Sequence, residues 1–207
     1  MPTCHHFGLS LSFRCDILKE IEEIIESIYP LSVNSRNQII DLIEFGEYKK
    51  GNCFIEKEKH NYHEYFLLDG ICRSYVLNPE GEEITIAFFN PGSVLSPYVT
   101  RTENGISNLN FQALTDLKVG IMDASEFLRL MVDHLDTREF GNMVLQLELQ
   151  NKVEKEIGHA SLVARERLLK FREKYPLLEN LVPHTTIATY LGITNISLSR
   201  LRKELIQ

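Results

Sequence analysis

Several features that would mark a membrane protein, a secreted protein or an enzyme are missing from this sequence. No apolar run is long enough to cross a membrane, and the first six residues lack the basic start and apolar stretch of a signal peptide. The sequence contains no glycine-rich phosphate loop, nucleophile elbow or catalytic-triad spacing. We therefore expect a cytoplasmic protein without a membrane partner and without enzymatic activity.

Cysteine is scarce, and the four cysteines are far apart in the sequence. Cys4, Cys15, Cys53 and Cys72 form no close pair, which indicates free thiols in a reducing compartment. We expect Cys53 and Cys72 to be buried thiols on strands.

The charged residues are distributed unevenly. The chain has a net charge of −7, yet residues 151–207 contain 10 Lys and Arg against 6 Asp and Glu, whereas residues 1–150 contain 12 against 23. An acidic body with a basic tail is typical of a protein that binds nucleic acid at one end.

The apolar residues change period along the chain. Residues 16–45 show helical spacing, with isoleucines three and four positions apart. In residues 46–123, short β-branched and aromatic runs alternate with turn signals, which predicts an antiparallel sandwich or barrel. Helical spacing returns over 124–158, and a basic amphipathic helix is predicted from 164 to 175.

The predicted helix over 139–157 has an apolar stripe, formed by Phe140, Met143, Val144, Leu147, Val153 and Ile157. Such a stripe fits a helix packed on its own domain, and it equally fits a helix that pairs in a dimer. The stripe alone does not separate these two interpretations.

Residues 184–205 have the pattern of a helix-turn-helix, in which two helices cross steeply through a very short turn. Gly192 provides the left-handed turn, and Thr194 is the expected N-cap of the second helix. The inner positions carry small or apolar residues: Ile187, Ala188, Leu191, Ile193, Leu198, Leu201 and Leu205.

The outer face of the second helix is polar and cationic, with Asn195, Ser197, Ser199, Arg200, Arg202 and Lys203. Such groups read base edges and hold phosphates. The alternative is an ordinary helical hairpin with a solvated face, but the combined offsets in a basic segment favour double-stranded DNA as the partner.

The motifs ARER at 164–167, YP at 175–176, VP at 182–183, IATYLGIT at 187–194 and LSR at 198–200 resemble the Crp/Fnr family of bacterial transcription regulators. Residues 65–89 with Pro91 and Gly92 are similar to the strands of its cyclic-nucleotide-binding-like domain.

The resemblance implies an α+β fold with three parts. These are an antiparallel β-roll (a double-stranded β-helix) with N-terminal helices over 1–135, a long dimerisation helix over 136–158, and a helix-turn-helix domain over 159–207. It implies a homodimer held through Phe140, Met143, Val144 and Leu147, a pseudo-palindromic operator, and RNA polymerase as a further partner. Because the sequence stops soon after the second helix of the motif, we expect a truncated or absent wing.

The sequence departs from the family's cyclic-AMP-binding pattern. Members that bind cyclic AMP carry a Gly-Glu pair and an Arg followed by Ser or Thr, which hold the ribose and the cyclic phosphate. Here Ser96 and Pro97 replace the pair, and Ser107 and Asn108 replace the second half. We expect no cyclic AMP binding, and either a filled roll or an uncharged effector near Ser96, Ser107, Asn108 and Asn110.

A second departure lies in the second helix of the motif. Ile196 occupies a position where relatives often carry Glu, so an apolar group suited to a thymine methyl replaces a cytosine acceptor. We expect Ile196 to contact DNA and to give this protein a different site preference.

The cysteines and histidines suggest two candidate cofactor sites. The cysteines lack the close spacing that an iron–sulfur cluster requires. His60, His63 and Glu64 are a candidate metal site of the kind that a cupin enzyme uses, but their polar surroundings are typical of a solvated loop. No metal and no cofactor is expected.

The leading hypothesis is a dimeric transcription regulator. The alternative is a ligand-sensing β-roll protein that acts through a protein partner and keeps a vestigial DNA-binding domain; a cupin-type enzyme is a distant third.

Overall fold

The computed structural model describes residues 11–96, 102–176 and 178–205. The N-terminal helices are α1 (Leu11–Ile28) and α2 (Val33–Asp41). The strands are β1 (Glu44–Tyr48), β2 (Cys53–Ile55), β3 (His63–Asp69), β4 (Cys72–Leu77), β5 (Glu83–Phe89), β6 (Val94–Leu95), β7 (Thr102–Glu103), β8 (Ile106–Ser107), β9 (Asn110–Ala113) and β10 (Leu117–Asp123). The remaining helices are α3 (Ala124–Asp133), α4 (Leu135–Ser161), α5 (Ala164–Lys174), α6 (Leu178–Leu181), α7 (His184–Leu191) and α8 (Asn195–Glu204).

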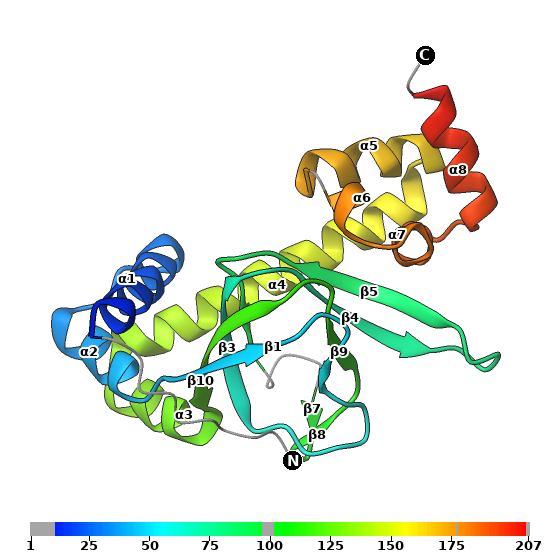
Figure 1. Cartoon of the computed structure of the whole chain (residues 1–207). Coiled ribbons are helices and arrows are strands. Elements are labelled where there is room, and N and C mark those ends of the chain that lie inside the picture. Colours follow the sequence, from blue (N-terminus) through cyan, green and yellow to red (C-terminus); the bar gives the residue numbers. More distant parts are fainter. Residues whose placement is uncertain (1–10, 97–101, 177, 206–207) are drawn as a thin grey trace.

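The strands form two antiparallel four-stranded sheets, in the orders β1-β10-β3-β6 and β2-β9-β4-β5, and the short pair β7-β8 (Figure 1). Buried apolar side chains fill the space between the two larger sheets, among them Ile55, Tyr65, Leu67, Phe111 and Val119. The antiparallel β architecture predicted for residues 46–123 is therefore confirmed.

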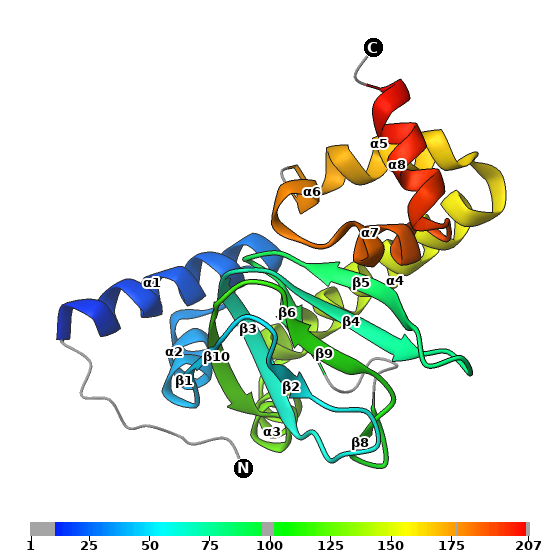
Figure 2. The ribbon, with the colours of Figure 1, turned by 45° about the vertical axis from the view of Figure 1, so that its right-hand side comes forward.

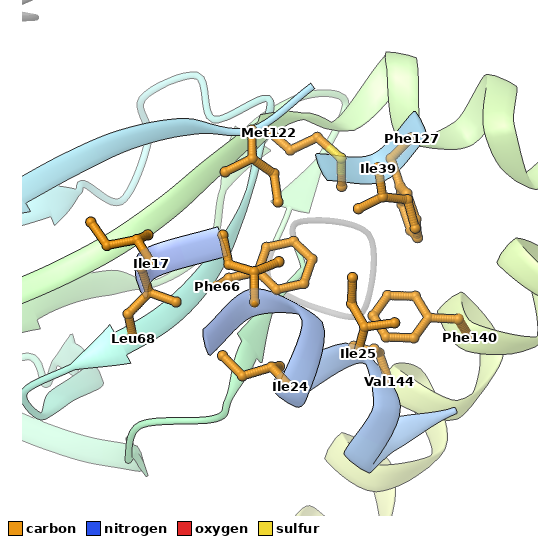
Figure 3. Packing of buried hydrophobic residues seen from close by; sticks show 12 residues of the cluster. Ile17, Ile24, Ile25, Ile39, Phe66, Leu68, Met122, Phe127, Phe140 and Val144 are labelled. Carbon is orange, nitrogen blue, oxygen red and sulfur yellow. The ribbon is translucent and has the colours of Figure 1, made fainter. Parts of the chain in front are cut away.

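A second core lies between the sheet that contains β3 and β10 and the helices α1 to α4 (Figure 3). The isoleucines of α1 recur at helical spacing, and Ile17, Ile21, Ile24 and Ile25 are all buried there. The expected helix to residue 45 is wrong at its end: β1 begins at Glu44 and pairs with β10.

Two residues expected in a dimer interface belong to this second core. The Phe140 ring is 1% exposed and lies 6.4 Å from the parallel Phe66 ring. Val144, one turn further along α4, is also buried (Figure 3). The expectation that Phe140 and Val144 face a partner is therefore corrected, because their part of the stripe packs on its own chain.

Helix α4 runs from this core to the C-terminal helices, which lie beside β5 (Figures 1 and 2). Phe88 of β5 and Leu114 share a third core with apolar residues of α5 to α8. No helix among the described residues is long and apolar enough to span a membrane.

Candidate nucleic-acid interface

The turn between α7 and α8 depends on one glycine and one N-cap. Gly192 has φ +65° and ψ 38°, the left-handed conformation that the sequence analysis predicted, and its N–H bonds the carbonyls of Ala188 and Thr189. Thr194 caps α8 by accepting a hydrogen bond from the Ser197 N–H at 3.1 Å. These local features make the connection between the two helices very short.

The inner faces of α7 and α8 pack together through apolar side chains. Ile187, Ala188, Leu191 and Leu198 are buried, while Leu201 is partly buried. The small side chain of Ala188 suits this close packing. The predicted scaffold residues are thus brought together in one apolar cluster.

The opposite face of α8 is open to solvent. Asn195, Ser199 and Lys203 are exposed, and the apolar Ile196 is 84% exposed. The Arg200 side chain is 76% exposed and its Nε lies 3.8 Å from a Glu204 carboxylate oxygen, a surface pair of little energetic weight. Ser197 is partly buried, and its hydroxyl lies 2.9 Å from that of Thr194.

Arg202 does not lie on this open face. Its Nε is 3.1 Å from Glu179 Oε1, and its Nη1 is 3.0 Å from His184 Nδ1. Glu179 also pairs with Arg172 at 2.5 Å. The expected role of Arg202 as a DNA contact is therefore corrected: the guanidinium links α8 to α6 and α7.

Helix α7 also packs directly on β5, a contact that the sequence analysis did not find. The Thr85 N–H donates to the Thr189 hydroxyl at 3.2 Å. The Phe88 ring lies 5.0 to 5.8 Å from the rings of Phe171, Tyr175 and Tyr190. All four aromatic residues lie in segments that the sequence analysis had singled out, but the contact between these segments was not predicted.

Two cations help to hold α7 in place. Lys155 Nζ donates to the Ile86 carbonyl at 2.6 Å and lies 4.3 Å from the Tyr190 ring centroid. Burial lowers the pKa of Lys155 to about 8. Arg167 donates to the Leu191 carbonyl at 3.0 Å and the Leu162 carbonyl at 2.7 Å, and so holds the ends of α7 and α4 together.

The four residues of the expected effector pocket have different surroundings among the described residues. The Ser96 hydroxyl donates to Glu64 at 3.1 Å and lines a cavity beneath α3 and α4, outside the roll interior. Ser107 is buried and donates to the Leu109 carbonyl at 2.7 Å. Asn108 is exposed, and Asn110 accepts from the Lys57 N–H at 2.9 Å. Ser96 therefore has different surroundings from Ser107 and Asn110, a difference that the positions in the sequence did not show.

The structure also places the candidate metal ligands and two of the cysteines. The His60 ring stacks on Tyr62, whereas Glu64 is buried beside Ser96, and no three metal-ligating side chains gather within the described ranges. Cys72 is buried in β4, whereas Cys53 in β2 is only partly buried. Cys4 and Pro97 lie outside the described residues.

The comparisons with known proteins agree with this architecture. Residues 45–134 match the family model of the cyclic nucleotide-binding domain. A search of curated proteins finds no match.

Solved structures of bacterial regulators share the fold. FixK2 from Bradyrhizobium japonicum is 23% identical, with a TM-score of 0.67 over 79% of this chain and 84% of its own. A transcriptional regulator of the Crp/Fnr family from Eubacterium rectale is 18% identical, with a TM-score of 0.66 over 84% of this chain and 83% of its own. The catabolite activator protein of Thermus thermophilus is 18% identical, with a TM-score of 0.53 over 86% and 85%. The chain thus contains a cyclic nucleotide-binding domain at residues 45–134, in a fold that it shares with regulators of the Crp/Fnr family.

Proposed function

We propose that the protein is a sequence-specific, DNA-binding transcription regulator of the Crp/Fnr type. The observation that carries this proposal is the open face of α8, which presents Asn195, Ile196, Ser199, Arg200 and Lys203 above a buried apolar base. The helix has 10 residues and is therefore about 15 Å long, which suits a major groove about 12 Å wide.

The cationic side chains of α8 have different expected roles. Arg200 lies near the middle of the open face and can donate two parallel hydrogen bonds to a guanine edge. Lys203 lies closer to the helix end and is expected to hold a phosphate. Arg202 is left out of the interface because Glu179 and His184 already bind its guanidinium.

Selection of bound DNA from a random pool, followed by titration of the selected site at several salt concentrations, tests the proposal. Arg200→Ala should cost about 1–3 kcal/mol and relax the preference at one base position, whereas Lys203→Ala should weaken all sequences alike and lower the salt slope by about 1. Lys50→Ala, at an exposed lysine in the roll, is the control and should change neither value. Equal losses on selected and random DNA for Arg200→Ala would contradict the base-reading role.

We also propose that the regulator is a homodimer that pairs through the second half of α4. Leu149, Val153 and Ile157 are four positions apart and are 59%, 44% and 57% exposed. They form an apolar row on the side of α4 away from β5. Leu147 is 41% exposed and Met143 is partly buried, so both flank this row rather than form its centre.

A two-fold dimer would place its two α8 helices on half-sites about 34–36 Å apart. In sedimentation, Val153→Glu should shift the protein from dimer to monomer at micromolar concentration, because it buries an unpaired carboxylate in the row. Val132→Glu is the matched control, since Val132 on α3 is 82% exposed and lies outside the row. A monomeric wild-type protein, with and without DNA, would refute the dimer.

A further inference from the structure

A pocket of about 250 Å³ lies where the β-roll meets the C-terminal helices. Its walls come from residues 86–89 of β5, from α4 between residues 144 and 155, and from Lys174, Tyr175 and Tyr190. The pocket therefore contacts the roll, the long helix and the unit that contains α7. It lies on the opposite side of α4 from the proposed dimer row.

The charges at this pocket are mainly positive. Lys152, Lys155 and Lys174 line it, and Glu148 is the single carboxylate among its lining residues. Lys152 Nζ is 3.9 Å from Glu148. Lys174 Nζ donates to Asn151 Oδ1 at 2.6 Å and lies 3.4 Å from Glu154. All three lysines belong to residues 151–207, the basic part of the chain.

Lys155 is the innermost of these cations and is held by neutral groups. Its ammonium donates to the carbonyls of Ile86, at 2.6 Å, and Thr85, at 3.4 Å, and lies over the Tyr190 ring. An ammonium has three donors, so two carbonyls leave one for a further acceptor. Burying a cation without a countercharge is unfavourable, and an anion in the pocket would remove that cost.

Most of the remaining lining is aromatic or aliphatic. The rings of Phe88, Tyr175 and Tyr190 pack together with centroids 5.0 to 6.1 Å apart. An apolar wall with a few charged donors favours a ligand with one anionic end and one apolar end. The volume lies below the range common for larger ligands, roughly 300–1,000 Å³, so the ligand must be small.

We propose that this pocket binds a compact organic anion, in which a carboxylate or phosphate meets Lys155 and Lys174 and a short apolar or aromatic part contacts Phe88 and Tyr190. Because the pocket wall includes both β5 and Tyr190 of α7, the bound anion contacts both sides of the junction. Binding of the anion does not rest on the DNA-binding proposal, and the two are tested separately.

Isothermal titration of the full chain with phenyl phosphate, phenol and inorganic phosphate tests the site. Phenyl phosphate should bind more tightly than either fragment alone. Lys155→Gln should weaken phenyl phosphate roughly ten- to a hundred-fold, as expected for the loss of a charge-assisted hydrogen bond. Lys174→Gln should weaken it less, and Lys170→Gln, at an exposed lysine of α5 outside the lining, should leave it unchanged.

Proton uptake gives a second readout. At pH 8 Lys155 is about half protonated, and a bound anion favours the charged form. Up to about half a proton should therefore enter on binding, measurable from titrations in buffers of different ionisation enthalpy. Lys155→Arg should bind phenyl phosphate without this uptake, because arginine stays protonated.

The other titratable groups near Lys155 should not take up this proton. Burial lowers the pKa of His159, so this imidazole is neutral at pH 8. Burial raises the pKa values of Tyr175 and Tyr190, so both phenols are neutral too. From β5, the ammonium meets only the backbone carbonyls of Thr85 and Ile86 among the contacts described.

Several results would overturn the site. One is the absence of heat and of any shift in melting temperature with millimolar phenyl phosphate. Equal affinities for phenol and phenyl phosphate would show that the site does not recognise the anionic group. If the wild type and a folded Lys174→Gln or Lys155→Gln variant bind phenyl phosphate equally well, the substituted lysine does not bind the anion. None of these outcomes depends on whether the selected DNA is bound.

Discussion

The buried ammonium of Lys155 should make the stability of the fold depend on alkaline pH. Its folded pKa of about 8 is below the ordinary 10.5 of the unfolded chain. Between these values the unfolded state binds more protons than the folded state, so the free energy of unfolding rises with pH. The full difference corresponds to about 3 kcal/mol. The Lys155 side chain is only partly buried, and the measured pH range ends at 9.5, below the unfolded pKa. The free energy of unfolding is therefore expected to rise by about 1–2 kcal/mol from pH 7 to pH 9.5.

Urea unfolding at pH 7, 8, 9 and 9.5 measures this rise, with Lys155→Met as the test variant and Lys170→Met as the control. Lys155→Met should flatten the pH profile, whereas Lys170→Met should keep the wild-type slope. The series stops at pH 9.5 because burial raises the pKa values of Tyr175 and Tyr190 in the fold. Above about pH 10 the unfolded phenols ionise first, and stability falls. Parallel profiles for the wild type and Lys155→Met would refute the assignment of the alkaline rise to Lys155.

Two further substitutions test the packing. Gly192→Ala should destabilise the fold by about 1–2 kcal/mol, because φ is +65° and the new Cβ would lie 2.9 Å from His159 Cε1. Gly81→Ala is the control, because Gly81 has φ +83° and no atom lies within 4 Å of the new Cβ. In urea unfolding this variant measures the cost of backbone strain alone. Equal losses in the free energy of unfolding at both sites would contradict a contribution from the contact with His159. Phe140→Ala should cost about 3–5 kcal/mol through the cavity that it leaves. A loss below about 1 kcal/mol at low protein concentration, together with loss of the dimer, would mean that Phe140 serves the dimer instead.

Features fixed by a few neighbouring residues were predictable from the sequence. The left-handed Gly192 and the N-cap Thr194 each follow from local chemistry. The antiparallel sheets follow from alternating short runs and turns, because strand patterning depends on side-chain period. Even here the end of a helix was misplaced, since the pairing of Glu44 with Ile121 involves residues far apart in the chain.

Features that depend on distant partners were not predictable in the same way. Arg202 looked like a free cation because Glu179, which binds it, lies in a short helix that has no periodic signal. Phe140 and Leu149 are both apolar positions of one helix, and only the fold shows that the first is buried and the second exposed. Ser96 and Ser107 were grouped by their positions in the family's cyclic-AMP-binding pattern, yet their side chains have different hydrogen-bond partners.

The placement of α7 on β5 depends on a chain of buried polar contacts that starts in the roll. Arg73 of β4 donates to Gln112 of β9 at 2.7 Å and to the Thr85 hydroxyl at 3.2 Å. The Thr85 hydroxyl lies 3.2 Å from that of Thr189. Arg73 also pairs with Glu83, so the buried guanidinium is neutralised where it bridges three strands.

This chain of contacts lies on the outer face of the β2-β9-β4-β5 sheet. Arg73, Gln112 and Phe88 are cross-strand partners, and Phe88 faces the C-terminal helices. The interior face of the same sheet carries apolar residues such as Phe111 and Cys72. The roll thus holds α7 through its outer face, next to Lys155 and the proposed anion pocket. Any change that moves β5 must move the Thr85–Thr189 contact and the aromatic packing of Phe88 together, because both lie on this one strand.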